Sequence, residues 1–162
     1  MCAFIDNTMF AFCRPGGNTT DGPAAPRVPL EVQEAWWTGW KKLHGLKWQT
    51  VILACGMDVD VSGPVSVRQN DVTQLHTSNI EERWLQLQEG QPTVFKMYGD
   101  SAYNWSDAMS TGIGRGYSSV RETVEFTYKD TKGQWKYCDY KHVLRLRQQP
   151  FGSILLSLFF IV

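Results

Sequence analysis

Alternating side chains in residues 3–13 predict a β-strand, because successive side chains of a strand point to opposite faces of its sheet. Both faces of this stretch are largely apolar, which is typical of a central strand. Residues 48–53 and 58–62 predict a second and a third strand, joined through a tight turn at 55–57 into a hairpin beside the first. We expect the Gly63-Pro64 pair to end the third strand.

A further strand is predicted over residues 93–99, where strand-forming side chains end in Gly99 and the chain turns at Asp100. A carboxylate in this position is held by a rigid element and still reaches solvent and ligand. The alternative is that Gly99 and Asp100 only start a turn. Asp6, within the first apolar strand, needs a partner, a proton or a bound cation, because an isolated buried carboxylate is costly. A structural salt bridge would also explain it.

Apolar residues at helical spacing predict two helices. The first is capped by Asn70 and runs to about Leu87, with a break near residues 78–79. The second begins at residues 118–119, where a glutamate three positions after the second serine completes a capping-box pattern. This second helix is expected to end near Gly133.

The other segments are less regular. Residues 14–29 and 104–116 are loops by composition, and residues 30–40 predict a short helix or an irregular aromatic segment. Residues 134–150 fit an amphipathic helix with one solvated face. The apolar residues 151–162 predict a core helix or strand, because a membrane span takes about 20 residues.

Composition indicates one globular domain with a sizeable core, since 43% of the 162 residues are hydrophobic and 20% are charged. The order of strands and helices predicts an α/β fold. Sixteen basic and sixteen acidic residues leave no net charge. This balance argues against attraction of nucleic acid to the whole surface, although it leaves a local basic face open.

The four cysteines form no CxxC pair and the three histidines stand far apart, so no structural-zinc spacing is present. The first ten residues lack the pattern of a secretory signal. We therefore expect an intracellular protein with reduced thiols. Because the chain stops inside an apolar run, we also expect it to be truncated.

A basic cluster at residues 41–47 contains Lys41, Lys42 and Lys47. Lysines can neutralise the phosphates of a nucleic-acid backbone, whereas the simpler interpretation is a solvated turn between two elements. Three neighbouring tryptophans could stack on bases, although tryptophans at this density are more often part of a core. These are Trp36, Trp37 and Trp40.

The predicted order of elements permits three carboxylates to converge, two from strands and one from a helix. They are Asp6, Asp100 and Glu125. Such a cluster repels itself unless divalent cations lie in it, and oxygen ligands of this kind suit Mg²⁺ or Mn²⁺. Two such ions can activate a water or a 3′-hydroxyl and stabilise the leaving oxygen of a phosphodiester.

Five short blocks in order resemble the PIF/Harbinger-type transposases, whose nuclease is a DDE superfamily endonuclease domain of the Tnp4-like kind. The blocks are Phe-Ile-Asp-Asn-Thr with Cys-Arg-Pro (4–15), Gly-Trp-Lys-Lys-Leu-His-Gly-Leu-Lys-Trp-Gln (39–49), Ser-Gly-Pro-Val with Arg68 and Asp71 (62–71), Tyr-Gly-Asp-Ser-Ala-Tyr (98–103) and Ser-Ser-Val-Arg-Glu-Thr-Val-Glu-Phe (118–126). The resemblance covers nearly the whole chain as a single domain.

The resemblance implies a ribonuclease-H-like α/β fold, a mixed sheet flanked by helices, truncated at both ends. It implies Mg²⁺-dependent or Mn²⁺-dependent cutting and joining of double-stranded DNA at transposon ends, with two ions held by Asp6, Asp100 and Glu125. Glu122 is a rival for the last position, but the spacing from Arg121 favours Glu125. Asp71 would have a structural or supporting role.

On the same resemblance, Lys41, Lys42, Lys47 and Arg121 would contact or orient phosphate. The protein would be nuclear and without a membrane contact, a separate DNA-binding protein would be a candidate partner, and oligomerisation is left open.

The chain also departs from the family pattern. Asn70 stands where the family usually has histidine, and the interval between Tyr103 and Ser118 is shorter than is typical. The shortened interval motivates an alternative: a catalytically inactive transposase-derived remnant that binds DNA or protein. A tryptophan-rich ligand-binding domain is a third interpretation.

Overall fold

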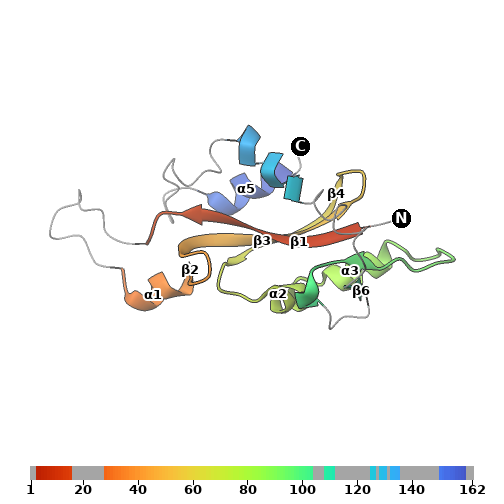
Figure 1. Ribbon diagram of the computed structural model, residues 1–162, viewed down its shortest axis with the longest axis horizontal. Coiled ribbons are helices and arrows are strands. Elements are labelled where there is room, and N and C mark those ends of the chain that lie inside the picture. Colours follow the sequence, from red (N-terminus) through yellow and green to blue (C-terminus); the bar gives the residue numbers. More distant parts are fainter. Residues whose placement is uncertain are drawn as a thin grey trace.

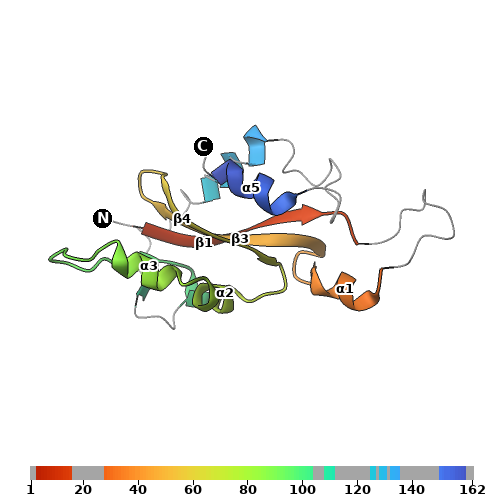
Figure 2. The same cartoon turned by 180° about the vertical axis from the view of Figure 1, so that it is seen from behind.

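The computed structural model describes residues 3–15, 28–103, 108–111, 125–126, 128–130, 132–135 and 150–159. Its centre is a mixed six-stranded sheet flanked by a few helices, so the α/β expectation is confirmed. In Figure 1, α2 and α3 lie on one side of the long strands and α5 lies on the other. The view from behind in Figure 2 shows the same two layers.

Three long strands and three short ones form the sheet. They are β1 (Ala3–Phe12), β2 (Trp37–Thr38), β3 (Leu43–Leu53), β4 (Asp58–Ser66), β5 (Met97–Tyr98) and β6 (Met109–Ser110). The strand order is β2-β3-β1-β5-β6, and β4 also pairs with β3. β1, β3 and β4 are antiparallel neighbours, whereas β5 runs parallel to β1 and to β6. The predicted hairpin beside the first strand is therefore confirmed.

The labelled helices are short. They are α1 (Leu30–Ala35), α2 (Asp71–Ser78), α3 (Ile80–Gln86), the 3-10 helix η1 (Ser101–Tyr103) and α5 (Phe151–Phe159). Helical backbone is also present at residues 125–126, 128–130 and 132–134. No helix among the described residues is long and apolar enough to cross a membrane.

The break between α2 and α3 lies where the sequence predicted it. Asn70 caps α2, because its Oδ1 accepts a hydrogen bond from the Val72 N–H at 2.8 Å. Asn79 ends α2 with a left-handed backbone, φ 55°, which asparagine tolerates better than most residues. The predicted cap and the predicted break are both confirmed.

Each face of the sheet carries one set of alternating side chains. The face under α2 and α3, called here the α2–α3 face, holds an apolar cluster that includes Ile5, Val51, Leu75, Ile80 and Trp84. The opposite side, called the α5 face, holds Phe10 against Trp48, with ring centroids 5.4 Å apart. Asp6 pairs in register with Thr50 and lies on the α5 face, whereas the next pair, Asn7 and Gln49, lies on the α2–α3 face.

Three predicted boundaries are wrong. β3 begins at Leu43 rather than at residue 48, because the far end of β1 pairs with it up to Phe12 and His44. β4 continues through the Gly63-Pro64 pair to Ser66. Its passage is close, since a Cβ at Gly63 would lie 2.9 Å from the Lys47 carbonyl oxygen.

The third wrong boundary is β5, which covers two residues instead of the predicted 93–99. Side chains form hydrogen bonds with the backbone groups that a longer strand would pair with its neighbours. Trp84 Nε1 donates to the Phe95 carbonyl at 2.8 Å, and the Phe95 N–H donates to Gln88 Oε1 at 2.5 Å. A strand ladder therefore cannot form at residue 95.

Several expectations fall outside the described residues. The helix start at 118–119, Arg121 and nearly all of 134–150 are among them, as are most of the loops 14–29 and 104–116. The apolar end of the chain, predicted as a helix or a strand, is helix α5.

Candidate functional site

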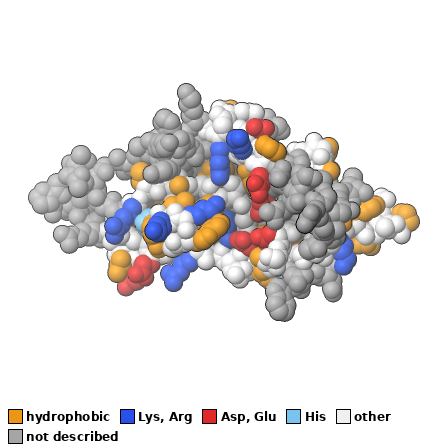
Figure 3. Space-filling model, in the orientation of Figure 1, with side chains coloured by type: hydrophobic (Ala, Val, Ile, Leu, Met, Phe, Trp, Pro, Cys, Tyr) orange, Lys and Arg blue, Asp and Glu red, His pale blue; other side chains and the backbone are white. Residues whose placement is uncertain are grey.

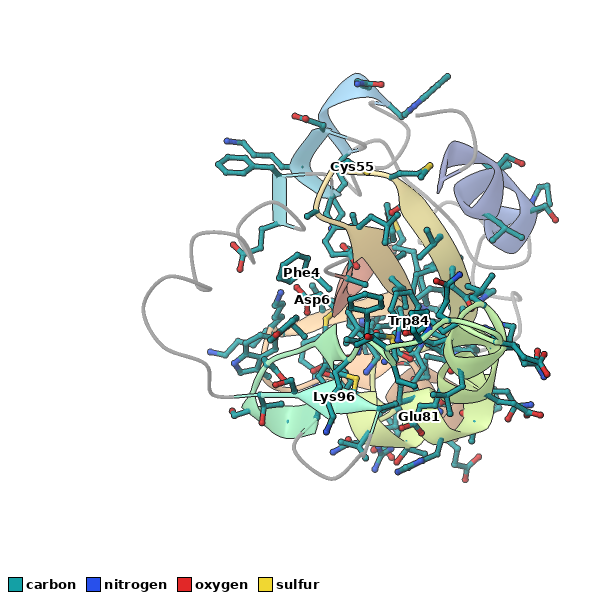
Figure 4. The ribbon with its side chains drawn as sticks, turned by 90° about the vertical axis from the view of Figure 1, so that its right-hand side faces the viewer. Phe4, Asp6, Cys55, Glu81, Trp84 and Lys96 are labelled. Atoms are coloured by element: carbon teal, nitrogen blue, oxygen red, sulfur yellow. The ribbon has the colours of Figure 1, made fainter. Side chains whose placement is uncertain are left out.

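Asp6 and Asp100 follow equivalent positions on neighbouring parallel strands. Phe4 of β1 pairs with Tyr98 of β5, and their ring centroids are 5.9 Å apart. Two positions further along each segment stand Asp6 and Asp100, both half-buried. Figure 4 shows Asp6 beside Phe4, between the described helical residues of the 125–134 region above (125–126, 128–130 and 132–134) and the segment with Lys96 below. The sheet therefore brings these two candidate carboxylates to one region.

Backbone N–H groups hold one oxygen of each aspartate. Asp6 Oδ1 accepts from the Asn7 N–H at 2.8 Å, and Asp100 Oδ1 accepts from the Ala102 N–H at 2.9 Å. The second bond closes the turn that opens η1, so Asp100 does start a turn as the simpler interpretation proposed. A turn and a functional carboxylate are compatible, because a carboxylate accepts several hydrogen bonds.

The helical residues that include Glu125 pack on the sheet at Asp6. Tyr128 is buried, its hydroxyl donates to the Asp6 carbonyl at 2.8 Å, and it shares a hydrogen bond with Thr50 Oγ1. Burial is the main cause that raises the Tyr128 pKa well above its ordinary value, and the charge of Asp6 adds to it. Glu125 stands one turn before Tyr128 and is exposed. The third candidate carboxylate therefore belongs to the element that covers Asp6.

Among the described residues, these carboxylates do not form a complete metal site. Among them, no three histidine, cysteine, aspartate or glutamate side chains lie close enough together to hold a metal ion. The donor chemistry suits Mg²⁺, because the candidates supply hard carboxylate oxygens. The donor types of Asp6, Asp100 and Glu125 therefore fit such an ion.

Tyr103 connects the neighbourhoods of the two aspartates on the α2–α3 face. Its hydroxyl accepts from Asn7 Nδ2 at 2.9 Å and from Gln49 Nε2 at 3.0 Å. Burial raises the pKa of Tyr103 above its ordinary value, and the charges of Asp71, Asp6 and Asp100 raise it further. The phenol therefore stays protonated. Sequence reasoning did not find this role, because nothing in the spacing of Tyr103 indicates which side chains it meets.

Lys47 was expected to contact phosphate, and the structure corrects this expectation. Its side chain is buried on the α2–α3 face, where Nζ lies 2.5 Å from Asp71 Oδ1 and also donates to the Gln69 carbonyl. The error follows from the β3 boundary, since a residue inside this strand points into the protein instead of into a solvated turn. Asp71 is thereby tied to β3 from the first turn of α2.

Lys41 and Lys42 lie in the turn between β2 and β3 and are exposed. The ammonium group of Lys41 lies 4.6 Å from the ring centroid of Trp40. The nearby tryptophans differ in burial: Trp48 is inaccessible, whereas Trp37 is 38% exposed and Trp40 is 77% exposed. These two lysines are therefore exposed to solvent, whereas Lys47 is buried.

A hollow of about 430 Å³ lies between α1 and the start of β3, and both Trp37 and Arg14 line it. His44 stacks on Trp37 with ring centroids 4.8 Å apart. Burial lowers the pKa of His44, and the charge of Arg14 lowers it further. This imidazole therefore favours its neutral form. The sequence pointed to aromatic and basic residues here but not to the hollow.

Comparison of the chain with protein-family models, with curated proteins and with solved structures finds no match. The α/β architecture therefore rests on the structure itself.

Proposed function

We propose that the chain is a DDE-type nuclease domain of a Harbinger-like transposase with a ribonuclease-H-like fold. It would cut and join phosphodiester bonds at the ends of transposon DNA. The mixed sheet flanked by helices supports this proposal, as does the position of Asp6 on a central strand next to the strand that precedes Asp100.

One observation carries the proposal. The helical residues with Glu125 are attached to the backbone of Asp6 itself, through the 2.8 Å hydrogen bond from Tyr128. The shortened interval before residue 118 therefore does not stop that helix from reaching the sheet at the first aspartate. Asp6, Asp100 and Glu125 are the proposed catalytic residues.

The proposed cofactor is Mg²⁺ or Mn²⁺, in two ions that Asp6, Asp100 and Glu125 would hold. Such ions would supply charge stabilisation and a nucleophile for phosphodiester cleavage. Lys41, Lys42 and Arg121 are proposed phosphate contacts, and Asp71 is a supporting residue that fixes α2 against β3. Double-stranded DNA is the proposed substrate and the nucleus the proposed location.

The test is nicking of supercoiled plasmid DNA by the purified chain in Mg²⁺ and in Mn²⁺. We expect Asp100→Asn to slow nicking by about 10²–10³-fold, the loss typical when one key charged or polar group is removed from an active site. Glu89→Gln is the control, because Glu89 is an exposed carboxylate that follows α3. Asp100→Asn protein that nicks as fast as the wild type would overturn the assignment.

Glu125→Gln tests the third residue against Asp130→Asn. Both positions are exposed and lie on the same run of helical residues. We expect the first substitution to abolish metal-dependent nicking and the second to leave it unchanged. Equal effects would remove Glu125 from the proposed site.

An inactive remnant that binds DNA or protein is the second candidate. It is favoured by the lack of a group of three metal-binding side chains among the described residues. Titration calorimetry with Mn²⁺ separates the two candidates. No heat of binding together with no nicking by the wild type would support the remnant.

A further inference from the structure

A second polar region lies at the opposite end of β1 from Asp100, beside α1 and β2. It is called here the aromatic–basic surface and consists of Arg14, Trp37, Trp40, Lys41, Lys42 and His44. In Figure 3, several Lys and Arg side chains lie over the end of the molecule that carries α1 and β2, together with acidic side chains at its lower edge, and further acidic side chains lie nearer the middle of the same face. Asp6 and Phe12 are six strand steps apart, or about 20 Å at about 3.3 Å per residue. The two regions are therefore distinct.

The two exposed indoles of this surface each have a neighbouring basic side chain against the ring, and Trp37 is also positioned by a strand. Lys41 lies over the Trp40 ring, and His44 lies against the Trp37 ring. Trp37 also belongs to β2, which pairs with β3 at His44. A ring that is already fixed loses little conformational entropy when a ligand stacks on it.

Cations lie near these rings, and one of them, Arg14, is held by a hydrogen bond. Arg14 Nε donates to Gln33 Oε1 at 2.7 Å, and Gln33 Nε2 donates to the Val28 carbonyl at 3.1 Å. Arg68 lines a second hollow of about 460 Å³, which Trp37 also lines. Glu34 lines both hollows and is the acidic residue that opposes an anionic ligand there.

We propose that the aromatic–basic surface binds an unpaired segment of a nucleic-acid strand, with bases stacked on Trp40 and Trp37 and with phosphates near Arg14 and the two lysines. Exposed aromatic rings beside cations are the usual features of single-strand binding, because every base has a face that can stack. In a duplex those faces are covered by neighbouring bases, so a duplex offers only its phosphates to this surface. The inference is independent of the carboxylates: a chain without nuclease activity would keep it.

The test is fluorescence anisotropy of a labelled oligothymidylate of about 10 nucleotides with the full chain in EDTA, so that metal chemistry plays no part. We expect Trp40→Ala to weaken binding about 10-fold, since one stacked base is typically worth that much or more. Trp40→Phe should restore most of the affinity because it keeps an aromatic face. Leu87→Ala is the control, since Leu87 is 64% exposed but lies at the end of α3.

Charge variants separate a defined site from general attraction. Lys41→Ala should reduce the slope of log K against log salt by about 0.7, the value for one phosphate on a single strand. Lys96→Ala, an exposed cation just before β5, should leave the slope unchanged. Glu34→Gln should tighten binding about twofold to threefold, because it removes the opposing charge.

Three results would overturn the proposal. One is Trp40→Ala protein that binds within twofold of the wild type. Another is a duplex of the same length that binds as tightly as the single strand. The third is equal loss of salt dependence in Lys41→Ala and Lys96→Ala. Because the probe is bound in EDTA, failure here leaves the proposed catalytic carboxylates standing and bears only on the phosphate contacts proposed for Lys41 and Lys42, and Asp100→Asn should not alter this binding.

Discussion

The two faces of the sheet are covered by different kinds of contact. On the α2–α3 face, α2 and α3 bury an apolar cluster against β1 and β3, with Trp84 in its centre. On the α5 face, the helical residues 128–130 and 132–134 form hydrogen bonds to β1 through polar groups. Tyr128 donates to the Asp6 carbonyl, and Lys132 Nζ donates to the Met9 carbonyl at 2.9 Å.

The difference indicates where the stability lies and where the proposed chemistry lies. A buried tryptophan side chain stabilises a fold by several kcal/mol, whereas a single hydrogen bond contributes about 0.5–1.5 kcal/mol net. The loss of Trp84 is therefore expected to cost more stability than the loss of either of these hydrogen bonds. The described helical residues around Tyr128, which lie over Asp6, are joined to β1 by hydrogen bonds that can open locally without unfolding the sheet.

The largest effect on stability is expected from a substitution in the apolar cluster of the α2–α3 face. Trp84 is 4% exposed and lies between α3 and the sheet (Figure 4). Trp84→Ala should lower the free energy of unfolding by about 3–5 kcal/mol, because it leaves a cavity and removes one of the two side-chain hydrogen bonds that the Phe95 carbonyl accepts. Urea denaturation measures this change.

Leu85→Ala, at the next position of α3, is the matched control for Trp84→Ala. Leu85 is 48% exposed, so the change should cost less than about 1 kcal/mol. Comparable losses at both positions would contradict the apolar cluster as the source of stability.

A smaller effect on stability is expected from removal of the Tyr128 hydroxyl, which lies on the α5 face, or of the Tyr103 hydroxyl, which lies on the α2–α3 face. Tyr128→Phe removes the hydrogen bonds to Asp6 and Thr50 and should cost about 1–2 kcal/mol. Hydrogen exchange should then rise at helical residues 128–130 and 132–134 while the long strands stay protected. Tyr103→Phe should instead reduce protection of β1 and β3, because Tyr103 belongs to the apolar cluster. Identical exchange patterns would remove the distinction between the faces.

The smallest expected effect concerns a carboxyl near Tyr128. Asp58 Oδ1 is buried and has no hydrogen-bond partner among the described residues, and burial raises the pKa of Asp58 to about 6. A pKa above the unfolded value means that protonation favours the fold. Stability should therefore be highest below about pH 4 and should fall as the pH rises through about 6.

Asp58→Asn tests this pH dependence by thermal denaturation at pH 7 and at pH 4. A shift of roughly 2 units corresponds to about 3 kcal/mol, and partial exposure reduces the expected gain at pH 7 to about 1 kcal/mol. The gain should vanish near pH 4. The exposed Asp130→Asn should change little at either pH, and a gain of equal size at both pH values would be evidence against a raised pKa at Asp58.

Local patterns in the sequence predicted much of the fold. The alternation in β1 and β3 and the Asn70 cap are signals carried by adjacent residues, and each corresponds to an observed element. β5 was overestimated because the contact that ends it comes from Gln88, seven positions earlier in the chain. A hydrogen bond between a side chain and a backbone group several residues away cannot be predicted from the periodicity of hydrophobic residues.

For the candidate site, sequence reasoning predicted which residues to examine but not their environments. Asp6 and Asp100 lie on neighbouring segments, as the order of elements permits. Lys47 shows the limit of this reasoning: a lysine next to Lys41 and Lys42 in a basic run is buried against Asp71, because strand β3 starts earlier than its composition indicates. Tyr103 and Tyr128 were not expected, since their partners lie on strands far away in the sequence.

The tight turn at Gly99 has a consequence for mutational scanning. A Cβ at this position would lie 2.6 Å from Tyr103 Cδ2 and 2.8 Å from Met109 Cε, so even alanine has no room. Gly39, in contrast, has no atom within 4 Å of such a Cβ. A library of all single substitutions should accept most residues at position 39 and almost only glycine at position 99. Position 99 should therefore be intolerant to substitution in such a library, whether or not Asp100 binds a metal.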